Sequence, residues 1–298
     1  MRVLITGASG LVGTELSRQL VARGDVPVRL VRRAAAGPNE ISWDPISGRI
    51  PADAMSGIDA VVNLAGATTG KLPWTTKYKR ELIQSRVGVT QTLVNAINAS
   101  VEKPKVLVSG SASGFYGDAG DRVLTEKDPN GQGFLAELAN NWEQAAAKVD
   151  PSVRLILIRT TMVMSRRLGA LGRLLPLIKL GIGGPLGNGK QWWAWISVVD
   201  EARAILHLID TQTASGPYNL TAPEPATCKQ VVAALGTELH RPTLLAVPAF
   251  ALRLILGEAA DELLLCSQNM SAQRLLDTGF KFEHPKLQQA AAWVVGKD

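Results

Sequence analysis

The stretch TGASGLVG, residues Thr6–Gly13, decides the fold. An apolar, β-branched run at Arg2–Thr6 leads into it, and a stretch with helical hydrophobic spacing at 11–23 follows it. The glycines are spaced GxxGxxG, and such a triplet alone also suits an ordinary strand-to-helix turn. A strand, a glycine-rich turn and a helix in direct succession indicate a phosphate-binding turn instead.

Each glycine of this turn has a physical role in binding a dinucleotide. Gly7 allows a tight reversal, Gly10 lets a pyrophosphate approach the backbone, and Gly13 lets the helix press against the sheet. The helix start adds unpaired N–H groups and a partial positive charge, which favour an anion. The expected cofactor contacts of the turn are Gly7, Ser9, Gly10, Leu11, Val12 and Gly13.

The first half of the chain alternates short β-branched runs with longer amphipathic ones. That alternation is the pattern of a parallel sheet covered by helices on both faces. Strands are expected at Arg2–Thr6, Val26–Val31, Ala60–Leu64, Lys105–Ser109 and Val153–Arg159, and helices at 11–23, 75–99 and 134–149. We therefore predict an α/β fold with a Rossmann-type, doubly wound parallel sheet.

The pattern loosens after residue 160, where Gly- and Pro-containing turns separate short helices. We expect residues 1–165 to form the dinucleotide-binding domain. Whether later segments of the chain also join this domain is left open. Residues 166–298 are expected to form a smaller, mostly helical substrate lobe, with a helical region from about 243.

Composition excludes several classes of protein. The 298 residues are 46% hydrophobic and 19% charged, which rules out collagen-like, disordered and disulfide-scaffold chains. Two cysteines without a CxxC pattern and three scattered histidines predict no metal site. The sequence shows neither a signal-peptide pattern nor an 18-residue apolar run, so we expect a cytoplasmic protein that does not engage a membrane.

Basic residues exceed acidic ones by 32 to 26, giving a net charge of +6. They form no long cluster and no nucleic-acid motif, so we expect no nucleic-acid partner. Arg32 and Arg33 follow the second strand, where an NAD-binding chain carries an acidic residue for the ribose 2′-hydroxyl. A guanidinium there suits a 2′-phosphate, which predicts NADP(H), although a solvated basic strand end is the plainer alternative.

Further motifs cover the rest of the chain. They are NLAG at Asn63–Gly66, YG at Tyr116–Gly117, ISWDP at 41–45, WTTKYKRELIQSR at 74–86, GGPLGNG at 183–189, WISVVD at 195–200 and RLILGEAADELLL at 253–265. With these motifs the chain resembles the extended short-chain dehydrogenases/reductases. More closely, it resembles their atypical sugar-nucleotide epimerase family, which carries a C-terminal domain of unknown function. The resemblance implies an NADP(H)-binding domain and a substrate lobe, but no established substrate.

The resemblance also implies contacts outside the glycine turn. The family pattern places further cofactor contacts at Leu64, Ala65, Gly66, Glu81, Arg86, Ser109 and Val163. Read without the family, Glu81 and Arg86 would be an exposed pair on a solvated helix, and Val163 would be a core valine.

Active members of this superfamily use a tyrosine as acid/base and a lysine four residues later that lowers its pKa. No YxxxK occurs in this chain. At the expected place, Phe134 or Leu135 replaces the tyrosine, and Leu138 or Ala139 replaces the lysine. None of these side chains can transfer a proton.

The remaining catalytic candidates are hydroxyl groups. Ser111 lies where the family serine orients the substrate oxygen, and Ser113 is the alternative because the loop before Tyr116 is one residue longer than usual. Tyr116 is the phenol nearest this loop along the chain, but the sequence places no lysine to activate it. Glu137, on the same helix as Phe134, is expected to face solvent.

Three tryptophans cluster at 192–195. We expect Trp195 to fill the seam between the lobes and Trp192 or Trp193 to line a substrate pocket. Asp200 is expected to cap a helix over Glu201–Ile209. One of Arg159, Arg166 and Arg167 could meet a substrate phosphate, since they follow a strand.

Two functions remain open at this point. The first is an NADP(H)-dependent oxidoreductase or epimerase that acts on an unidentified small molecule, with nucleotide-linked molecules among the candidates. The second is a non-catalytic NADP(H)-binding sensor, favoured by the absent Tyr–Lys pair. The oligomeric state is not predicted.

Overall fold

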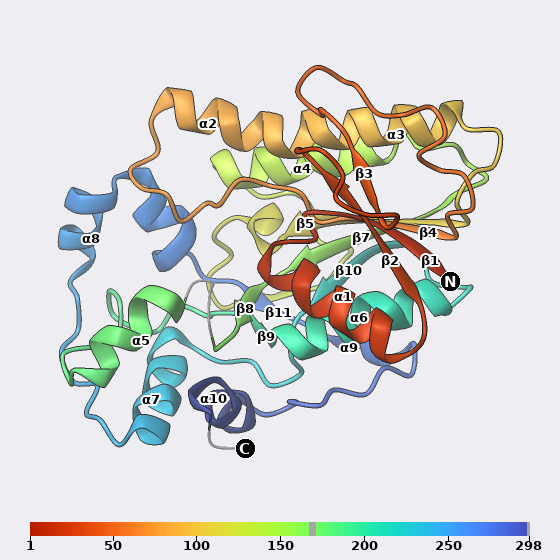
Figure 1. Cartoon of the computed structure of the whole chain (residues 1–298). Coiled ribbons are helices and arrows are strands. Elements are labelled where there is room, and N and C mark those ends of the chain that lie inside the picture. The colour runs from red at the N-terminus through yellow and green to blue at the C-terminus, as the bar shows by residue number, and fades with distance from the viewer. Residues whose placement is uncertain (167–170, 297–298) are drawn as a thin grey trace.

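A seven-stranded parallel sheet forms the centre of the computed structural model, which describes residues 1–166 and 171–296. Its strand order is β10-β7-β5-β4-β1-β2-β3 (Figure 1). The strands are β1 (Arg2–Thr6), β2 (Val26–Val31), β3 (Glu40–Ser42), β4 (Ala60–Asn63), β5 (Val106–Ala112), β7 (Arg154–Thr160) and β10 (Gly216–Leu220). Every pairing between them is parallel, so the predicted doubly wound sheet is confirmed.

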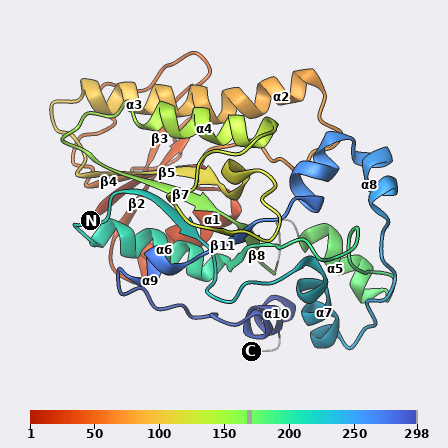
Figure 2. The ribbon, with the colours of Figure 1, turned by 180° about the vertical axis from the view of Figure 1, so that it is seen from behind.

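Helices cover both faces of this sheet (Figures 1 and 2). One face carries α2 (Thr76–Ile83), α3 (Val89–Ala99) and α4 (Phe134–Ala146), and the other carries α1 (Leu11–Ala22) and α6 (Val198–Asp210). Each face buries its own apolar cluster, since alternate strand residues point to opposite sides. The helix expected over 75–99 is interrupted by a π-helical segment, Gln84–Gly88.

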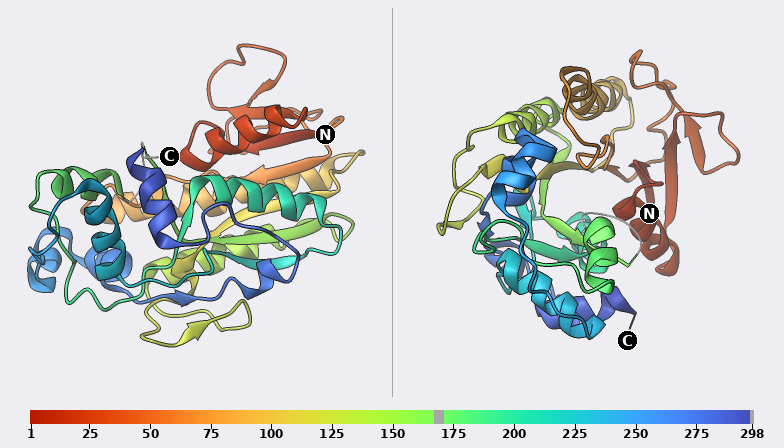
Figure 3. Two further views of the ribbon diagram at one scale, coloured as in Figure 1. Left: turned by 90° about the horizontal axis from the view of Figure 1, so that it is seen from below. Right: turned by 90° about the vertical axis from the view of Figure 1, so that its left-hand side faces the viewer.

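The second half of the chain adds a lobe beyond the carboxyl ends of the strands (Figure 3). Its elements are α5 (Leu171–Lys179), α7 (Cys228–Leu239), α8 (Ala249–Leu256), a π-helical segment at Ala260–Leu265 and α10 (Leu287–Val295). The short helix α9 (Gln273–Leu276) packs against β10 instead. Two short strand pairs accompany the lobe, β8 (Met162–Met164) with β9 (Trp195–Ser197), and β6 (Val123–Leu124) with β11 (Asn269–Met270). Both α6 and β10 return to the central layers, so the chain after residue 166 contributes to both parts.

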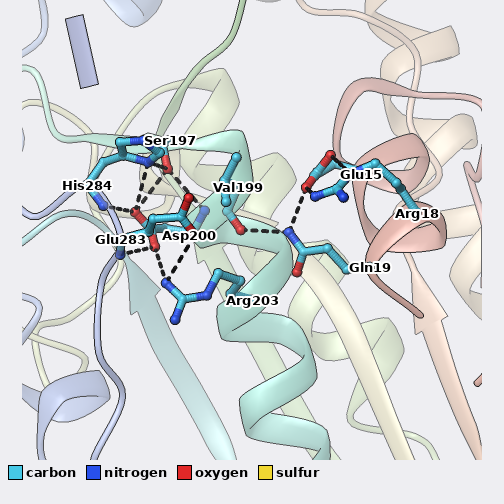
Figure 4. A network of polar contacts seen from close by, with 9 residues as sticks. All are labelled: Glu15, Arg18, Gln19, Ser197, Val199, Asp200, Arg203, Glu283 and His284. Atoms are coloured by element: carbon cyan, nitrogen blue, oxygen red, sulfur yellow. Dashed lines mark hydrogen bonds and ion pairs between the residues drawn. The ribbon is translucent and has the colours of Figure 1, made fainter. Parts of the chain in front are cut away.

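Asp200 does not cap a helix, contrary to the expectation. Ser197 caps α6, because its hydroxyl accepts a hydrogen bond from the Asp200 backbone N–H at 3.0 Å. The fully buried Asp200 carboxylate instead accepts from the backbone N–H groups of Glu283 and His284 and pairs with Arg203 (Figure 4). It thereby ties the segment before α10 to α6.

The length and apolar content of the helices can be compared with those of a membrane span. Within residues 1–166 and 171–296, none of the helices is both long and apolar enough to cross a bilayer.

Candidate functional site

The glycine turn is packed too closely for side chains. Gly7 has φ +67°, and a Cβ atom there would lie 2.6 Å from the Leu64 carbonyl oxygen. A Cβ on Gly13 would lie 2.4 Å from the Gly7 carbonyl oxygen. Both distances are shorter than any real contact, so this turn requires glycine at both positions, as the sequence predicted.

The start of α1 has free hydrogen-bond donors. Gly10 is its N-cap residue, no side chain caps the helix, and no acidic residue lies in its first turn. Ser9 and Gly10 are exposed, whereas Leu11 and Val12 are half-buried. Uncapped N–H groups with the positive end of the helix dipole are an anion site.

The loop after β4 faces this turn. Thr6 Oγ1 accepts hydrogen bonds from the backbone N–H groups of Leu64 and Ala65, both at 3.1 Å, and donates to Asn63 at 2.7 Å. These bonds hold the loop in register against Gly7. Asn63 Nδ2 in turn lies 3.5 Å from the hydroxyl oxygen of Ser109. Ser109 is fully buried behind Asn63, so its expected contact with the cofactor is not supported.

Arg86 lies beside the same loop, in the π-helical segment. A Cβ atom on Gly66 would lie 3.1 Å from Arg86 Cζ, so the guanidinium packs directly on the loop backbone. Burial lowers the pKa of Arg86 to about 10, and no carboxylate pairs with it among the described residues. A partly desolvated guanidinium without a counter-ion is suited to binding an anion.

The two arginines after β2 differ in their surroundings. Arg33 forms a two-pronged ion pair with Glu40, with both N–O distances at 2.7 Å. Arg32 is exposed, and no ion pair holds it in the described part of the chain. The expectation for Arg33 therefore needs correction: edge strand β3 brings Glu40 beside it, and Arg32 is the guanidinium left for a phosphate.

The two remaining expected contacts, Val163 and Glu81, differ in their surroundings. Val163, in β8, is partly buried and packs against the apolar cluster that lies between the sheet and α1 and α6. Glu81 is exposed on α2, as the plainer interpretation of a solvated helix expected.

Ser111 belongs to a buried polar network. Its hydroxyl donates to Glu143 at 2.6 Å, and Glu143 forms a two-pronged ion pair with Arg159 at 2.9 and 3.0 Å. The Ser111 residue is 4% exposed and Arg159 is 3% exposed. Glu143 comes from α4, the helix in which the tyrosine and lysine are missing. Arg159 therefore serves this carboxylate and not a substrate phosphate.

Tyr116 is poorly suited to the acid/base role considered for it. Its hydroxyl donates to Asn219 at 2.6 Å and accepts from Arg159 at 2.8 Å. Burial raises the pKa of Tyr116 to about 12, more than the nearby Arg159 lowers it. A useful general acid needs a pKa near the working pH, so this environment shifts the phenol in the wrong direction.

The missing tyrosine is replaced by packing. Phe134 lies against Trp74, with ring centroids 5.6 Å apart, and Leu138 is buried in the same cluster. The backbone N–H groups of Phe134 and Leu135 donate to Glu262 of the lobe, at 2.7 and 2.6 Å. Glu137 is exposed, as expected. The start of α4 thus anchors the lobe and presents no proton donor of its own.

Comparisons with known proteins agree with this geometry. The family model described as "NAD dependent epimerase/dehydratase family" matches residues 3–221, and a domain of unknown function (DUF1731) matches residues 247–294. An epimerase family protein of Mycobacterium leprae is 41% identical over 293 residues, covering 98% of this chain and 94% of that one. The human epimerase family protein SDR39U1 is 34% identical over 300 residues, covering 99% and 100%.

The chain belongs to the NAD-dependent epimerase/dehydratase family. Among solved structures, human SDR39U1 with NADPH superimposes with a TM-score of 0.92 at 31% identity, covering 99% of both chains. A nucleoside-diphosphate sugar epimerase from Corynebacterium glutamicum gives a TM-score of 0.78 at 30% identity, covering 99% of this chain and 58% of that one. The resemblance inferred from the sequence motifs is confirmed.

In this epimerase-family chain the tryptophan cluster holds segments together. Trp192 Nε1 donates to Asp121, Trp193 Nε1 donates to the Leu264 carbonyl, and Trp195 Nε1 donates to the Glu224 carbonyl. Trp195 is fully buried in the lobe core, against which Trp193 also packs. Both indoles bridge parts of the protein, and Trp192 also lines a narrow crevice with Ala194 and Met270, so the pocket-wall role expected for Trp192 or Trp193 stays a prediction. Ser113 is half-buried in the short helix after β5.

A hollow of about 550 Å³ lies away from the glycine turn, along the later part of α1. Its charged walls are paired: Glu15 with Arg18, and Arg203 with Asp200 and Glu283 (Figure 4). Arg166 donates to the Trp293 carbonyl at 2.6 Å beside this hollow, and Arg167 lies outside the described residues. We assign no ligand to this hollow, since its polar groups satisfy one another.

Three functional features of this family member escaped the sequence analysis. They are Glu143 as the partner of Ser111, Glu262 as the cap of α4, and the π-helical segment that carries Arg86. Glu143 stands three turns inside an amphipathic helix, and nothing in the local pattern marks it as buried. A contact across 128 residues, as between Phe134 and Glu262, leaves no local signal.

Proposed function

We propose that the chain is a cytoplasmic NADP(H)-binding oxidoreductase or epimerase that acts on an unidentified small molecule, with nucleotide-linked molecules among the candidates. The observation that carries the proposal is the uncapped turn at the start of α1, in which Gly7 and Gly13 leave no room for a side chain and which faces the Leu64–Gly66 loop. The NADPH complex of human SDR39U1, which shares this fold over 99% of both chains, supports the choice of cofactor.

The residues present fit a dinucleotide phosphate. The N–H groups of Leu11 and Val12 would hold the pyrophosphate, and Arg32 would pair with the 2′-phosphate. Arg86 adds a desolvated positive charge beside Gly66. When bound, the cofactor would supply hydride exchange at its nicotinamide ring.

Arg32→Ala is expected to remove most of the preference for NADPH over NADH. The wild type should bind NADPH more tightly by about 1–3 kcal/mol, the range for a charged hydrogen-bonded contact. Fluorescence titration with both nucleotides measures this difference.

Arg33→Ala is the matched control, because Arg33 already pairs with Glu40. It should leave the nucleotide preference largely intact. Equal affinities of the wild type for the two nucleotides, or a larger loss in Arg33→Ala than in Arg32→Ala, would refute the assignment to Arg32.

Ser111 is the side chain that we assign to the reacting oxygen. Its proton is directed at Glu143, and the Glu143–Arg159 ion pair holds both groups in place. Because this proton is given to Glu143, Ser111 Oγ is left to accept a hydrogen bond, and it would hold a substrate hydroxyl in a fixed orientation.

Ser111→Ala is expected to lower any NADPH oxidation found with a panel of sugar nucleotides and carbonyl compounds by about tenfold to a hundredfold. Ser113→Ala is the control, and it should leave turnover near the wild-type value. Unchanged turnover in Ser111→Ala would remove Ser111 from the mechanism.

A second candidate function is a non-catalytic sensor of NADP(H). It is favoured by the apolar residues of α4 that replace the family's acid/base pair, with Phe134 or Leu135 in place of the tyrosine and Leu138 or Ala139 in place of the lysine. Tight NADPH binding without turnover across a broad panel would favour this sensor over the enzyme.

A further inference from the structure

One buried carboxyl group on α6 is incompletely hydrogen-bonded. Glu201 is fully buried, and its Oε1 accepts a hydrogen bond from Thr160 Oγ1 at 2.6 Å. Its Oε2 has no hydrogen-bond partner, the one buried side-chain N or O atom of this kind within residues 1–166 and 171–296. An ionised carboxylate is costly in such a place. Burial accordingly raises the pKa of Glu201 to about 8, so the group holds a proton at neutral pH.

The charged groups on neighbouring elements have other partners. The strands β5, β8, β9 and β10 carry no charged residue, and the charged residues of α6, α1 and β7 are engaged elsewhere. Those residues are Asp200, Arg203, His207 and Asp210 of α6, Glu15, Arg18 and Arg23 of α1, and Arg154 and Arg159 of β7. Glu283, in the segment that ties to α6, lies 3.8 Å from Arg203. Thr160 is thus the polar side chain to which the Glu201 carboxyl is hydrogen-bonded.

Thr160 connects this carboxyl to the carboxyl edge of the sheet. It is half-buried and is the last residue of β7, at the edge where ligands bind in open parallel sheets. Val163, three residues later, packs against the same apolar cluster as Val12 and Leu64. Val12 lies in the glycine turn, and Leu64 lies in the loop that faces this turn. Ala202, next to Glu201, belongs to that cluster too.

We infer that Glu201 is a proton store for this edge of the sheet and that it acts through the Thr160 hydroxyl, from the face opposite to the one on which α4 lacks the tyrosine and lysine. The inference rests on the proposed function. In the structure the Thr160 hydroxyl donates to Glu201 Oε1, so the transfer requires this hydroxyl to turn toward the bound molecule while Oε1 carries the carboxyl proton. Thr160 then gives its proton to an oxygen of the bound molecule and takes the proton of Glu201, which becomes a carboxylate. The reverse transfer restores the acid, so protons balance and these two residues undergo no redox change.

The inference makes a prediction for nucleotide binding that needs no substrate. An oxidised nicotinamide ring is positively charged and favours ionised Glu201, whereas the reduced ring is neutral. The affinity for NADP⁺ relative to NADPH should therefore rise with pH between about 6 and 8, approaching tenfold per pH unit for one released proton. The 2′-phosphate also titrates near pH 6, but it does so in both nucleotides and cancels in the ratio.

Titrations of both nucleotides across this pH range test the inference in four variants. Glu201→Gln should make the ratio independent of pH, while the exposed control Glu137→Gln should keep the wild-type slope. Thr160→Val should shift the pH-dependent rise of the affinity ratio to higher pH, because it removes the hydrogen bond that favours the carboxylate form of Glu201. Thr160→Ser should restore the wild-type range.

Thermal unfolding gives a readout that needs no nucleotide. Between pH 4.5 and about 8, the Glu201 carboxyl keeps its proton in the folded state, whereas it has lost this proton in the unfolded state. Wild-type stability should therefore fall as pH rises from about 4.5 towards 8, and Glu201→Gln should lack this part of the fall.

The outcomes separate the two proposals. A ratio without pH dependence in the wild type, an unchanged slope in Glu201→Gln, or identical pH profiles of Tm would overturn the role of Glu201, while NADPH binding would still stand. If neither nucleotide binds, the proposed function fails and the inference fails with it.

Discussion

Arg159→Ala is expected to lower the free energy of unfolding by about 3–5 kcal/mol, because it leaves the Glu143 carboxylate buried without a counter-charge. The side chains of Arg159 and Glu143 are 4% and 10% exposed and are joined by two hydrogen bonds. The guanidinium also lies 3.6 Å from the centroid of the Phe115 ring and donates to Tyr116. Equilibrium denaturation in urea measures the loss.

Two further variants make this result specific. Arg18→Ala removes a surface ion pair with Glu15, and it should cost less than about 1 kcal/mol. The double variant Arg159→Met, Glu143→Leu removes both charges, so it should be more stable than Arg159→Ala alone. A double variant no more stable than Arg159→Ala would contradict the assignment of the cost to the unpaired charge.

Gly13→Ala is expected to weaken NADPH binding by about a hundredfold, the scale for a displacement of about 1 Å at a binding site. The new Cβ would lie 2.4 Å from the Gly7 carbonyl oxygen and 2.7 Å from Ala8 Cα. Both are backbone atoms, so α1 must move away from the turn that holds the phosphate. We also expect a loss of about 1–3 kcal/mol in the free energy of unfolding from overpacking. Titration with NADPH and thermal unfolding measure the two effects.

Gly37→Ala is the matched control for this substitution. Gly37 is exposed, its φ is not in the left-handed region, and nothing lies within 4 Å of an added Cβ. It should leave NADPH binding unchanged. Near-normal binding by Gly13→Ala would mean that the turn tolerates a side chain and that the phosphate binds elsewhere.

The fold was predictable because its signals are local. The strands at Arg2–Thr6 and Val26–Val31 were located correctly, and the helix expected at 11–23 ends one residue earlier. Strand β5 runs three residues beyond the expected end, to Ala112, and places Ser111 within the sheet. This extension depends on pairing with β7, which continues as far as Ala112 and Thr160.

The candidate site was predictable in part. The glycine turn and the facing loop depend on residues adjacent in the chain, whereas the status of each arginine depends on its neighbours in space. Arg33 proved to be paired with Glu40, while Arg86 lacks such a partner among the described residues. Arg33 and Arg86 thus differ in the charge that they can offer a ligand.

The sequence by itself determined the α/β class, the parallel sheet and the position of the phosphate-binding turn, because hydrophobic periodicity and glycine spacing act between near neighbours in the chain. Only the tertiary structure decided that Ser111 donates to Glu143, 32 residues away, and that Glu201 is buried with one oxygen unpaired. Burial and ion pairing arise from contacts between distant segments, and these contacts set the protonation of the groups on which the chemistry depends.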